Sequence, residues 1–264
     1  RKFKTVWDSK GFDNQNGTQE TKALLGGDFM SYPKPVALMR EICLLGAPDG
    51  GLVLDLFAGS GTTAQAVLET SALDGKRRQF VMIQLDEKLS EGSPAHRAGY
   101  KTIADLSRDR VRRAGVKILD ETGLAAEGSD VGFRALRVDT TNMADVLRTP
   151  DETDQQALAG LEGSVKSDRT AEDLLFQVLL DWGLDLTMTI DVEQFGEREV
   201  FVVEDDALVA CFDNEISADL VRSLAQREPL RAVFRDSGFA SDDDRINAEQ
   251  IFKELSPATD VKAI

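Results

Sequence analysis

The stretch at residues 53–63, VLDLFAGSGTT, changes from an apolar run to a glycine turn and then to two threonines. The run at residues 52–57 is apolar except for Asp55, which predicts a short buried strand of a parallel sheet. Gly59 and Gly61 can adopt backbone angles that other residues avoid, and they let a ligand approach the main chain. A strand followed by such a turn and a helix is the first unit of a nucleotide-binding α/β fold.

A helix is predicted directly after this turn. Thr62 or Thr63 can cap its N-terminus, and the segment TAQAVLETSAL supplies its body. The N-terminus of a helix presents free N–H groups and the positive end of the helix dipole. The sequence therefore predicts a site for a nucleotide-like ligand at the glycine turn.

Composition and length limit the class of protein. The 264 residues allow one large domain or two ordinary ones, and 42% hydrophobic with 30% charged residues is typical of a soluble globular chain. No stretch approaches the roughly 20 apolar residues of a membrane span, and the start of the chain lacks the apolar core of a signal peptide. Because the chain begins with Arg1, we expect a piece of a longer polypeptide. We expect Cys43 and Cys211 to be buried free thiols of a cytoplasmic protein, and the single histidine, His96, predicts no metal site.

Charge divides the chain in two. Residues 1–130 hold 18 basic and 18 acidic side chains, whereas residues 131–264 hold 13 and 29 and so account for the whole net charge of −16. We therefore predict two domains, at residues 1–120 and 131–264, joined by a polar linker at 121–130. The acidic half is a poor candidate for a surface that binds DNA phosphates, because such surfaces need Lys and Arg.

Patterns along the chain predict further elements in the first half. Residues 1–20 are predicted as a loop or tail, and TQETKALLGG as a short helix that a glycine ends. Pro33 and Pro35 predict an extended entry into a helix at residues 36–45. Residues 79–85 are predicted as a second buried strand, and YKTIADLSRDRVRRAGVKIL as an amphipathic helix with its arginines facing outward.

The second half is predicted to form a smaller α/β domain. The expected strong helix RTAEDLLFQVLLDWGLDL has Thr170 as its cap, and EVFVVEDDALVACFD is predicted to be a hairpin around an Asp-Asp turn. A strand is predicted in GFRALRVDTTN, and residues 143–168 are expected to be irregular. Helix, strand, helix and strand are then predicted in SADLVRSLAQRE, PLRAVFRDS, DDDRINAEQIFKEL and DVKAI.

Three common nucleotide and nucleophile motifs do not fit the glycine turn. A phosphate-binding P-loop needs Lys after its last glycine, but Gly61 is followed by Thr62. A hydrolase elbow needs glycine where Ala58 and Thr62 stand. The dinucleotide fingerprint needs a third glycine at position 64, where Ala64 fits only its looser Gly/Ala form. An NAD-type enzyme is therefore disfavoured, and S-adenosylmethionine remains as the candidate ligand.

The segment DLFAGSGTT resembles the Asp-x-Phe-x-Gly-x-Gly signature of amino-group DNA methyltransferases. In the subclass with permuted motif order, a proline-lysine-proline element comes before this strand, as in YPKPVALMREI here. A second strand with a polar end follows and meets the ribose. Here FVMIQL ends near Gln84, and Asp86 and Glu87 follow it, so that the residue at the ribose stays open among these three. Further segments, among them GTQETKALLG, IADLSRDRVRRAG and DRTAEDLLFQVLLDWGLDLT, resemble the C-terminal part of the modification subunit of type III restriction–modification systems.

This resemblance implies a partial Rossmann-like methyltransferase core that binds S-adenosylmethionine, followed by a smaller α/β domain that serves assembly. It implies an adenine-N6 DNA methyltransferase that dimerises, recruits a restriction helicase-nuclease subunit, and acts on DNA without any membrane association. The cofactor-binding residues that it implies are Lys34, Pro35, Asp55, Phe57, Ala58, Gly59, Ser60, Gly61, Thr62, Thr63 and Gln84.

The family's catalytic tetrapeptide, Asp-Pro-Pro-Tyr, is absent from the chain, which contains no Pro-Pro pair. In the family this tetrapeptide orients the target amine and stacks on the flipped adenine. No catalytic residue is therefore predicted here, and we expect the chain alone to be inactive. The alternative hypothesis is a non-catalytic assembly module with a vestigial methyltransferase fold.

Overall fold

The structure, a computed structural model, describes Trp7 and residues 9–123, 130–143 and 165–264. The chain divides into two compact units, Arg1–Ala135 and Leu136–Ile264. Both units combine helices with a sheet, which confirms the predicted mixed α/β class. Within the described part of the chain, no helix is long and apolar enough to cross a membrane.

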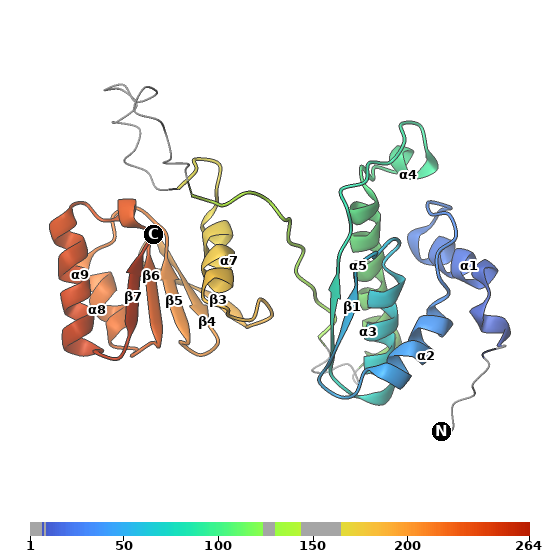
Figure 1. The fold of residues 1–264 in the computed structure, drawn as a ribbon, viewed down its shortest axis with the longest axis horizontal. Helices are drawn as coiled ribbons and strands as arrows, with labels where there is room; N and C mark the ends of the chain where they lie inside the picture. The colour runs from blue at the N-terminus through green and yellow to red at the C-terminus, as the bar shows by residue number, and fades with distance from the viewer. Residues whose placement is uncertain (1–6, 8, 124–129, 144–164) are drawn as a thin grey trace. The chain divides into compact units, whose positions relative to one another are not determined.

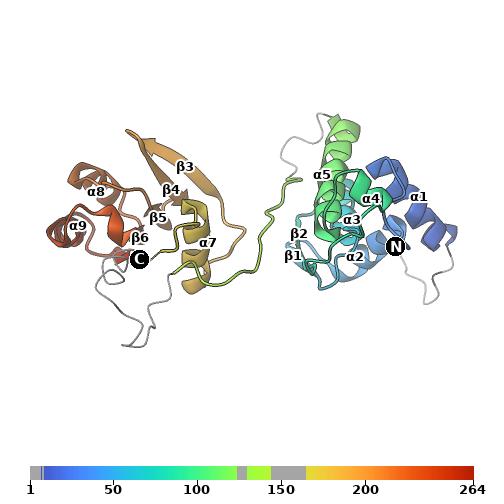
Figure 2. The same ribbon diagram turned by 90° about the horizontal axis from the view of Figure 1, so that it is seen from above.

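In the first unit, all the larger helices lie on one side of a two-stranded sheet (Figures 1 and 2). Strands β1 and β2 are parallel, and α3 connects them, so that β1, α3 and β2 form the predicted strand–helix–strand unit. The elements in chain order are η1 (Lys10–Phe12), α1 (Asn14–Leu25), α2 (Val36–Gly46), β1 (Gly51–Asp55), α3 (Thr62–Asp74), β2 (Arg78–Met82), α4 (Pro94–Arg97) and α5 (Ile103–Thr122).

The sheet of the first unit is buried on one face only. On the covered face, Val53 and Phe80 pack against Val36 and Val67 of α2 and α3. The prediction of two fully buried strands is therefore wrong for the opposite face, because no helix of the described residues lies against it. Parallel strands are normally covered on both faces, and this pair carries apolar side chains on both. The exposed aliphatic side chains, here called the open sheet face, are Leu52, Leu54, Leu56, Val81, Ile83 and Leu85.

Helix α1 begins earlier than predicted. Residues 14–17, expected in a loop or tail before the predicted helix, are helical because the side chain of Asp13 caps the helix by accepting a hydrogen bond from the N–H of Asn16. Gly17 of this helix lies against the backbone before α2, where a Cβ atom would come within 2.2 Å of the carbonyl oxygen of Pro33. The N–H of Val36 donates to Oε2 of Glu20 over 2.9 Å. Helix α1 thus supports the Pro-Lys-Pro element and the start of α2.

The second unit is a five-stranded sheet with helices on both faces. Its order is β3-β4-β5-β6-β7, with antiparallel pairing from β3 to β5 and parallel pairing from β5 to β7. Helices α8 and α9 pack on one face and α7 on the other (Figures 1 and 2). The bounds are α7 (Ala171–Asp181), β3 (Ile190–Phe195), β4 (Arg198–Val203), β5 (Leu208–Cys211), α8 (Ala218–Ala225), β6 (Arg231–Phe234), η4 (Asp236–Gly238), α9 (Asp242–Leu255) and β7 (Asp260–Ala263).

Several predictions for the second unit are confirmed. Thr170 caps α7 in a reciprocal arrangement with Asp173, and β4 and β5 form the expected hairpin. The later helices and strands also occur in the expected segments. Strand β3 was not predicted. It pairs along its whole length with β4, so that the hairpin is the inner part of a three-stranded antiparallel group.

The strand predicted at residues 132–142 is wrong, because this segment pairs with no named strand of the described part. Val131 and Phe133 instead pack against the first unit, next to Val111 and Ile118 of α5. The first unit accordingly extends to Ala135, five residues beyond the expected linker at 121–130. Most of the segment expected to be irregular, residues 144–164, lies outside the described residues, as do 124–129 of the linker.

Candidate functional site

The glycine turn lies between the end of β1 and the start of α3. Gly59 and Gly61 have φ angles of 52° and 77°, which side-chain-bearing residues rarely adopt. Helix α5 approaches the second glycine so closely that a Cβ atom there would lie 2.7 Å from Oγ of Ser107 and 3.1 Å from its carbonyl oxygen. Position 61 therefore requires glycine both for its backbone angle and for its contact with α5.

The start of α3 differs from the prediction that a threonine caps it. Gly61 occupies the cap position in a left-handed conformation, and Thr62 and Thr63 are the first two residues of the helix. The hydroxyl of Thr63 donates to Oδ2 of Asp55, and Oδ1 of the same carboxylate accepts from the N–H of Phe57 over 3.0 Å. One carboxylate at the end of β1 thus holds both ends of the turn. The first N–H groups of α3 have no partner within the helix, as at any helix start.

The end of β2 contributes the other side of the turn. The N–H of Gly59 donates to Oε1 of Gln84 over 2.8 Å, and the N–H of Ala58 donates to the carbonyl oxygen of Ile83 over 2.9 Å. Asp86 and Glu87 are both exposed. The backbone carbonyl of Glu87 accepts from the N–H of Ile103 at the start of α5, which gives this residue a structural role. Of the three candidates for the ribose, Gln84 is the one with a side-chain contact to the turn.

The remaining site residues divide into buried and exposed ones. Ser60, Thr62 and Thr63 are 5%, 4% and 4% exposed, so their hydroxyl groups face the interior. Phe57 is 84% exposed at the end of β1.

Pro35 is the buried N-cap residue of α2, and the adjacent Lys34 is exposed. The hydrogen bonds described around the turn do not include these two residues. The cofactor-binding role of all eleven residues stays a prediction.

A buried arginine behind the turn was missed. Arg110 of α5 is fully buried, although the arginines of this helix were predicted to face outward. Its Nε donates to Oε1 of Gln65 and its Nη1 donates to Oγ of Ser60 and Oγ1 of Thr62, each over 2.8 Å. Its spacing was the available signal: it is four residues after Leu106 and four before Ala114, in the middle of the buried stripe of the helix.

Burial lowers the pKa of the Arg110 guanidinium to about 10, because a desolvated site disfavours the charged form. The carboxylates of Glu20 and Glu69 act in the opposite direction and favour the charged form. The guanidinium is therefore still protonated at neutral pH, and a full positive charge lies directly behind the glycine turn.

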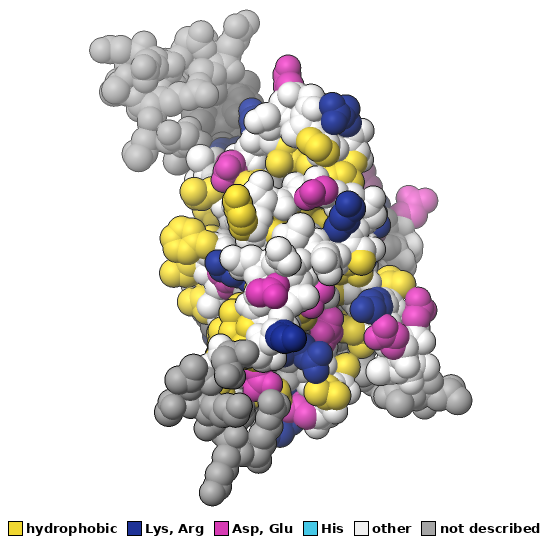
Figure 3. All heavy atoms as spheres, turned by 90° about the vertical axis from the view of Figure 1, so that its right-hand side faces the viewer, with side chains coloured by type: hydrophobic (Ala, Val, Ile, Leu, Met, Phe, Trp, Pro, Cys, Tyr) yellow, Lys and Arg dark blue, Asp and Glu magenta, His cyan; other side chains and the backbone are white. Residues whose placement is uncertain are grey.

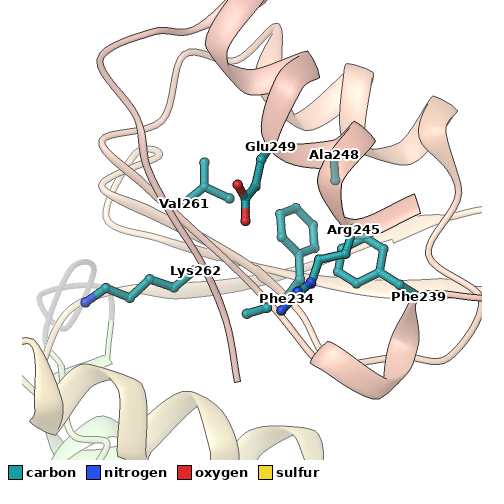
Figure 4. Close-up of a pocket in the computed structure, with 8 residues that line it drawn as sticks. Phe234, Phe239, Arg245, Ala248, Glu249, Val261 and Lys262 are labelled. Carbon is teal, nitrogen blue, oxygen red and sulfur yellow. The ribbon is translucent and has the colours of Figure 1, made fainter. Parts of the chain in front are cut away.

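A separate pocket in the second unit is too small for a ligand. It lies between β6, β7 and α9 and has room for about one water molecule (Figure 4). Phe234 and Phe239 line it with their rings 5.8 Å apart, and the charged side chains of Arg245 and Glu249 lie at its margin. Among the described residues, no group of three His, Cys, Asp or Glu side chains could hold a metal ion.

The glycine turn with its Asp55 and Gln84 contacts occurs in a segment that known proteins share. Residues 1–93 match the DNA methylase family, N6_N4_Mtase. The chain is also 40% identical over 134 residues to the type III restriction–modification enzyme StyLTI Mod subunit of Salmonella typhimurium, in an alignment that covers 51% of this chain and 20% of the relative. These matches confirm the resemblance to type III modification subunits.

Two further proteins are similar to this chain, one a type III and the other a type II enzyme. The type III restriction–modification enzyme EcoPI Mod subunit of Escherichia phage P1 is 34% identical over 136 residues, which are 52% of this chain and 21% of the relative. The type II methyltransferase M.KpnI of Klebsiella pneumoniae is 29% identical over 110 residues, which are 42% and 26% of the two chains. The matched region is thus about a fifth to a quarter of the length of each of these curated relatives.

Proposed function

We propose that the chain is a region of a site-specific DNA adenine-N6 methyltransferase, the modification subunit of a type III restriction–modification system. Its first unit is proposed to bind S-adenosylmethionine in a Rossmann-like core. The observation that carries this proposal is the meeting of Asp55, Gly59 and Gln84 where two parallel strands end and α3 begins. Ligands of open α/β sheets bind at the carboxyl ends of the strands, next to helix N-termini.

Each part of the turn has a proposed task. S-adenosylmethionine, when bound, supplies a methyl group on a positively charged sulfur. Because Ser60, Thr62 and Thr63 bury their hydroxyl groups, the turn is proposed to offer backbone N–H groups to the ligand. The Oε1 atom of Gln84 already accepts from the turn, which leaves its amide N–H groups for a ribose hydroxyl. The exposed ring of Phe57 offers an apolar contact surface.

A matched pair of glycine variants tests the cofactor site. Gly61→Ala introduces a Cβ atom 2.7 Å from Ser107, whereas Gly75→Ala, at the other end of α3, meets nothing within 4 Å. Both positions have left-handed backbones, so both variants carry the same strain of roughly 1–2 kcal/mol. We expect Gly61→Ala to weaken the binding of S-adenosylmethionine by about tenfold or more, because the turn must shift. Isothermal titration calorimetry on chain 1–264 measures both affinities.

The Gly75→Ala variant separates general destabilisation from damage to the site. It is expected to lose stability and to keep the parental affinity. Equal affinity in Gly61→Ala and the parent would show that the ligand binds elsewhere. No binding by the parent chain at all would favour the alternative, a non-catalytic assembly module.

The second unit is proposed to serve assembly with another subunit, as a dimer contact or a contact with the restriction helicase-nuclease subunit. Residues 131–264 carry the whole net charge of −16, which opposes contact with DNA phosphates. In the first unit, acidic and basic side chains are interspersed over the face shown in Figure 3, without a basic stripe. DNA contacts are therefore proposed to come mainly from parts of the methyltransferase that this chain does not contain.

We expect chain 1–264 to bind mixed-sequence duplex DNA hardly at all, even at low salt. Fluorescence anisotropy at low and moderate salt measures the affinity, and analytical ultracentrifugation measures self-association and association with the restriction subunit. Binding that weakens steeply with salt would instead show a surface that neutralises phosphates. The assembly role would be refuted if, in addition, the chain stayed monomeric and did not bind the restriction subunit.

A further inference from the structure

We propose that Arg110 is a positioning residue, which holds the glycine turn in the conformation that binds the cofactor. The proposal rests on the proposed function of the turn. The side chain reaches from α5 to the residues on both sides of Gly61, because Nη1 donates to Ser60 and to Thr62 over 2.8 Å each. The two accepting hydroxyl oxygens are themselves 3.0 Å apart. One guanidinium nitrogen thus joins the two neighbours of the left-handed glycine.

Packing alone does not account for a charged residue at this position. A buried charge costs free energy unless it is paired and fully hydrogen-bonded. The hydrogen-bond acceptors of Arg110 are the neutral side chains of Ser60, Thr62 and Gln65, and its Nη2 atom is buried without a hydrogen-bond partner. A methionine would fill a similar volume without this cost. The carboxylates of Glu20 and Glu69 offset part of this cost. The hydrogen bonds of the arginine, however, go to the residues on both sides of Gly61, so we place its benefit in holding the turn.

Helix α5 contacts the turn through two residues one helical turn apart, Ser107 and Arg110. Ser107 lies against Gly61 and leaves no room for a Cβ atom there, and Arg110 holds the flanking hydroxyl groups. Because the hydroxyls of Ser60 and Thr62 are bound from the interior, they are not available to a ligand on the outside. Arg110 therefore acts on the ligand only through the backbone of the turn.

Two variants at this position separate the role of hydrogen bonding from that of volume. Arg110→Met keeps a similar volume and removes every donor, whereas Arg110→Lys keeps a positively charged hydrogen-bond donor on a long side chain. Arg108→Met, on the exposed side of the same helix, removes only a surface pair with Asp105 and is the control. All three are made in chain 1–264. Calorimetric titration with S-adenosylmethionine and with the neutral product S-adenosylhomocysteine gives the affinities. Amide hydrogen exchange at residues 58–63 measures how often the backbone of the turn opens.

We expect Arg110→Met to weaken the binding of both ligands by about tenfold or more, since charged hydrogen bonds that hold the turn are lost. Exchange at residues 58–63 should rise by about tenfold, while exchange in β5 and β6 of the second unit stays unchanged. Arg110→Lys should recover most of the affinity, and Arg108→Met should change the affinity by less than about twofold, as is usual for a surface pair. An equal effect on the charged and the neutral ligand is the mark of positioning, because a direct field effect would act differently on them.

Parental affinity and parental exchange in a folded Arg110→Met variant would overturn the proposal. So would an Arg110→Lys variant that binds no better than Arg110→Met. If Arg110→Met does not fold, Ser60→Ala takes its place, because it removes one of the two hydroxyl groups that accept from Nη1 of Arg110. Faster exchange at residues 58–63 with weaker binding then supports positioning, and parental values of either measurement refute it. If the parent chain binds neither ligand, the proposed cofactor site fails, while the exchange measurement still decides whether Arg110 holds the turn.

Discussion

Chain 1–264 is expected to transfer no methyl group to DNA, even where it binds S-adenosylmethionine. Methyl transfer needs the target amine to be held in line with the donor, and much of an enzyme's rate enhancement comes from such positioning. The resemblance to amino-group DNA methyltransferases assigns this task to an Asp-Pro-Pro-Tyr element, and the chain contains no Pro-Pro pair. The loss relative to a complete modification subunit should therefore be total within the detection limit.

A tritiated-methyl transfer assay on mixed-sequence DNA measures this activity, with a complete type III modification subunit as the positive control. The same preparation of the chain is first titrated with S-adenosylmethionine, so that absence of turnover is not confused with absence of cofactor. Turnover above background would mean that other residues of this chain orient the amine. The assignment of the catalytic element would then be wrong.

Phe234→Ala is expected to lower the free energy of unfolding of the second unit by about 3–5 kcal/mol, the usual cost of removing a buried phenylalanine. Phe234 is 1% exposed in β6, and its ring centroid lies 5.8 Å from that of Phe239 and 6.0 Å from that of Phe252. Truncation leaves a cavity between the sheet and α9. Because the first unit has its own core, its affinity for S-adenosylmethionine should not change.

Urea unfolding, followed by circular dichroism and by tryptophan fluorescence, measures the loss, and calorimetry measures the affinity. Leu180→Ala, at a side chain of α7 that is 63% exposed, is the control and should change the stability by about 0.5 kcal/mol or less. A Phe234→Ala variant that loses cofactor binding as the second unit unfolds would show that the two units fold as one.

Local patterns in the sequence predicted the parts of the site that depend on local chemistry. The strand, the glycine turn and the helix follow one another directly in the sequence, from Gly51 to Asp74. The caps of the second unit are equally local, because Thr170 and Ser241 each bond a backbone N–H three residues away. The prediction that a threonine caps α3 was wrong for a physical reason. Gly61 itself takes the cap position, and the hydroxyl of Thr63 donates a hydrogen bond to Asp55 instead.

The features that were missed depend on contacts distant in sequence. Arg110 reaches residues 45 to 50 positions away, and outward-facing arginines are the more usual pattern on an amphipathic helix. Gln84 accepts from the N–H of Gly59 across 25 residues, a contact that was not predicted. The family resemblance had indicated Gln84 only as one of three candidates for the ribose. The segment at residues 132–142 was predicted to be a strand, but its Phe133 and the preceding Val131 pack against the first unit instead of joining a sheet.

The open sheet face also decides which assays can be used on the isolated chain. Its six aliphatic side chains lie on β1, β2 and the residues after them, and each is at least 41% exposed. Environment-sensitive dyes such as ANS fluoresce on surfaces of this kind, which is why they are used to detect molten states. A dye-monitored melt of the chain will start from a bright baseline, so that a shift on adding S-adenosylmethionine is masked. Label-free tryptophan fluorescence or calorimetry avoids this artefact.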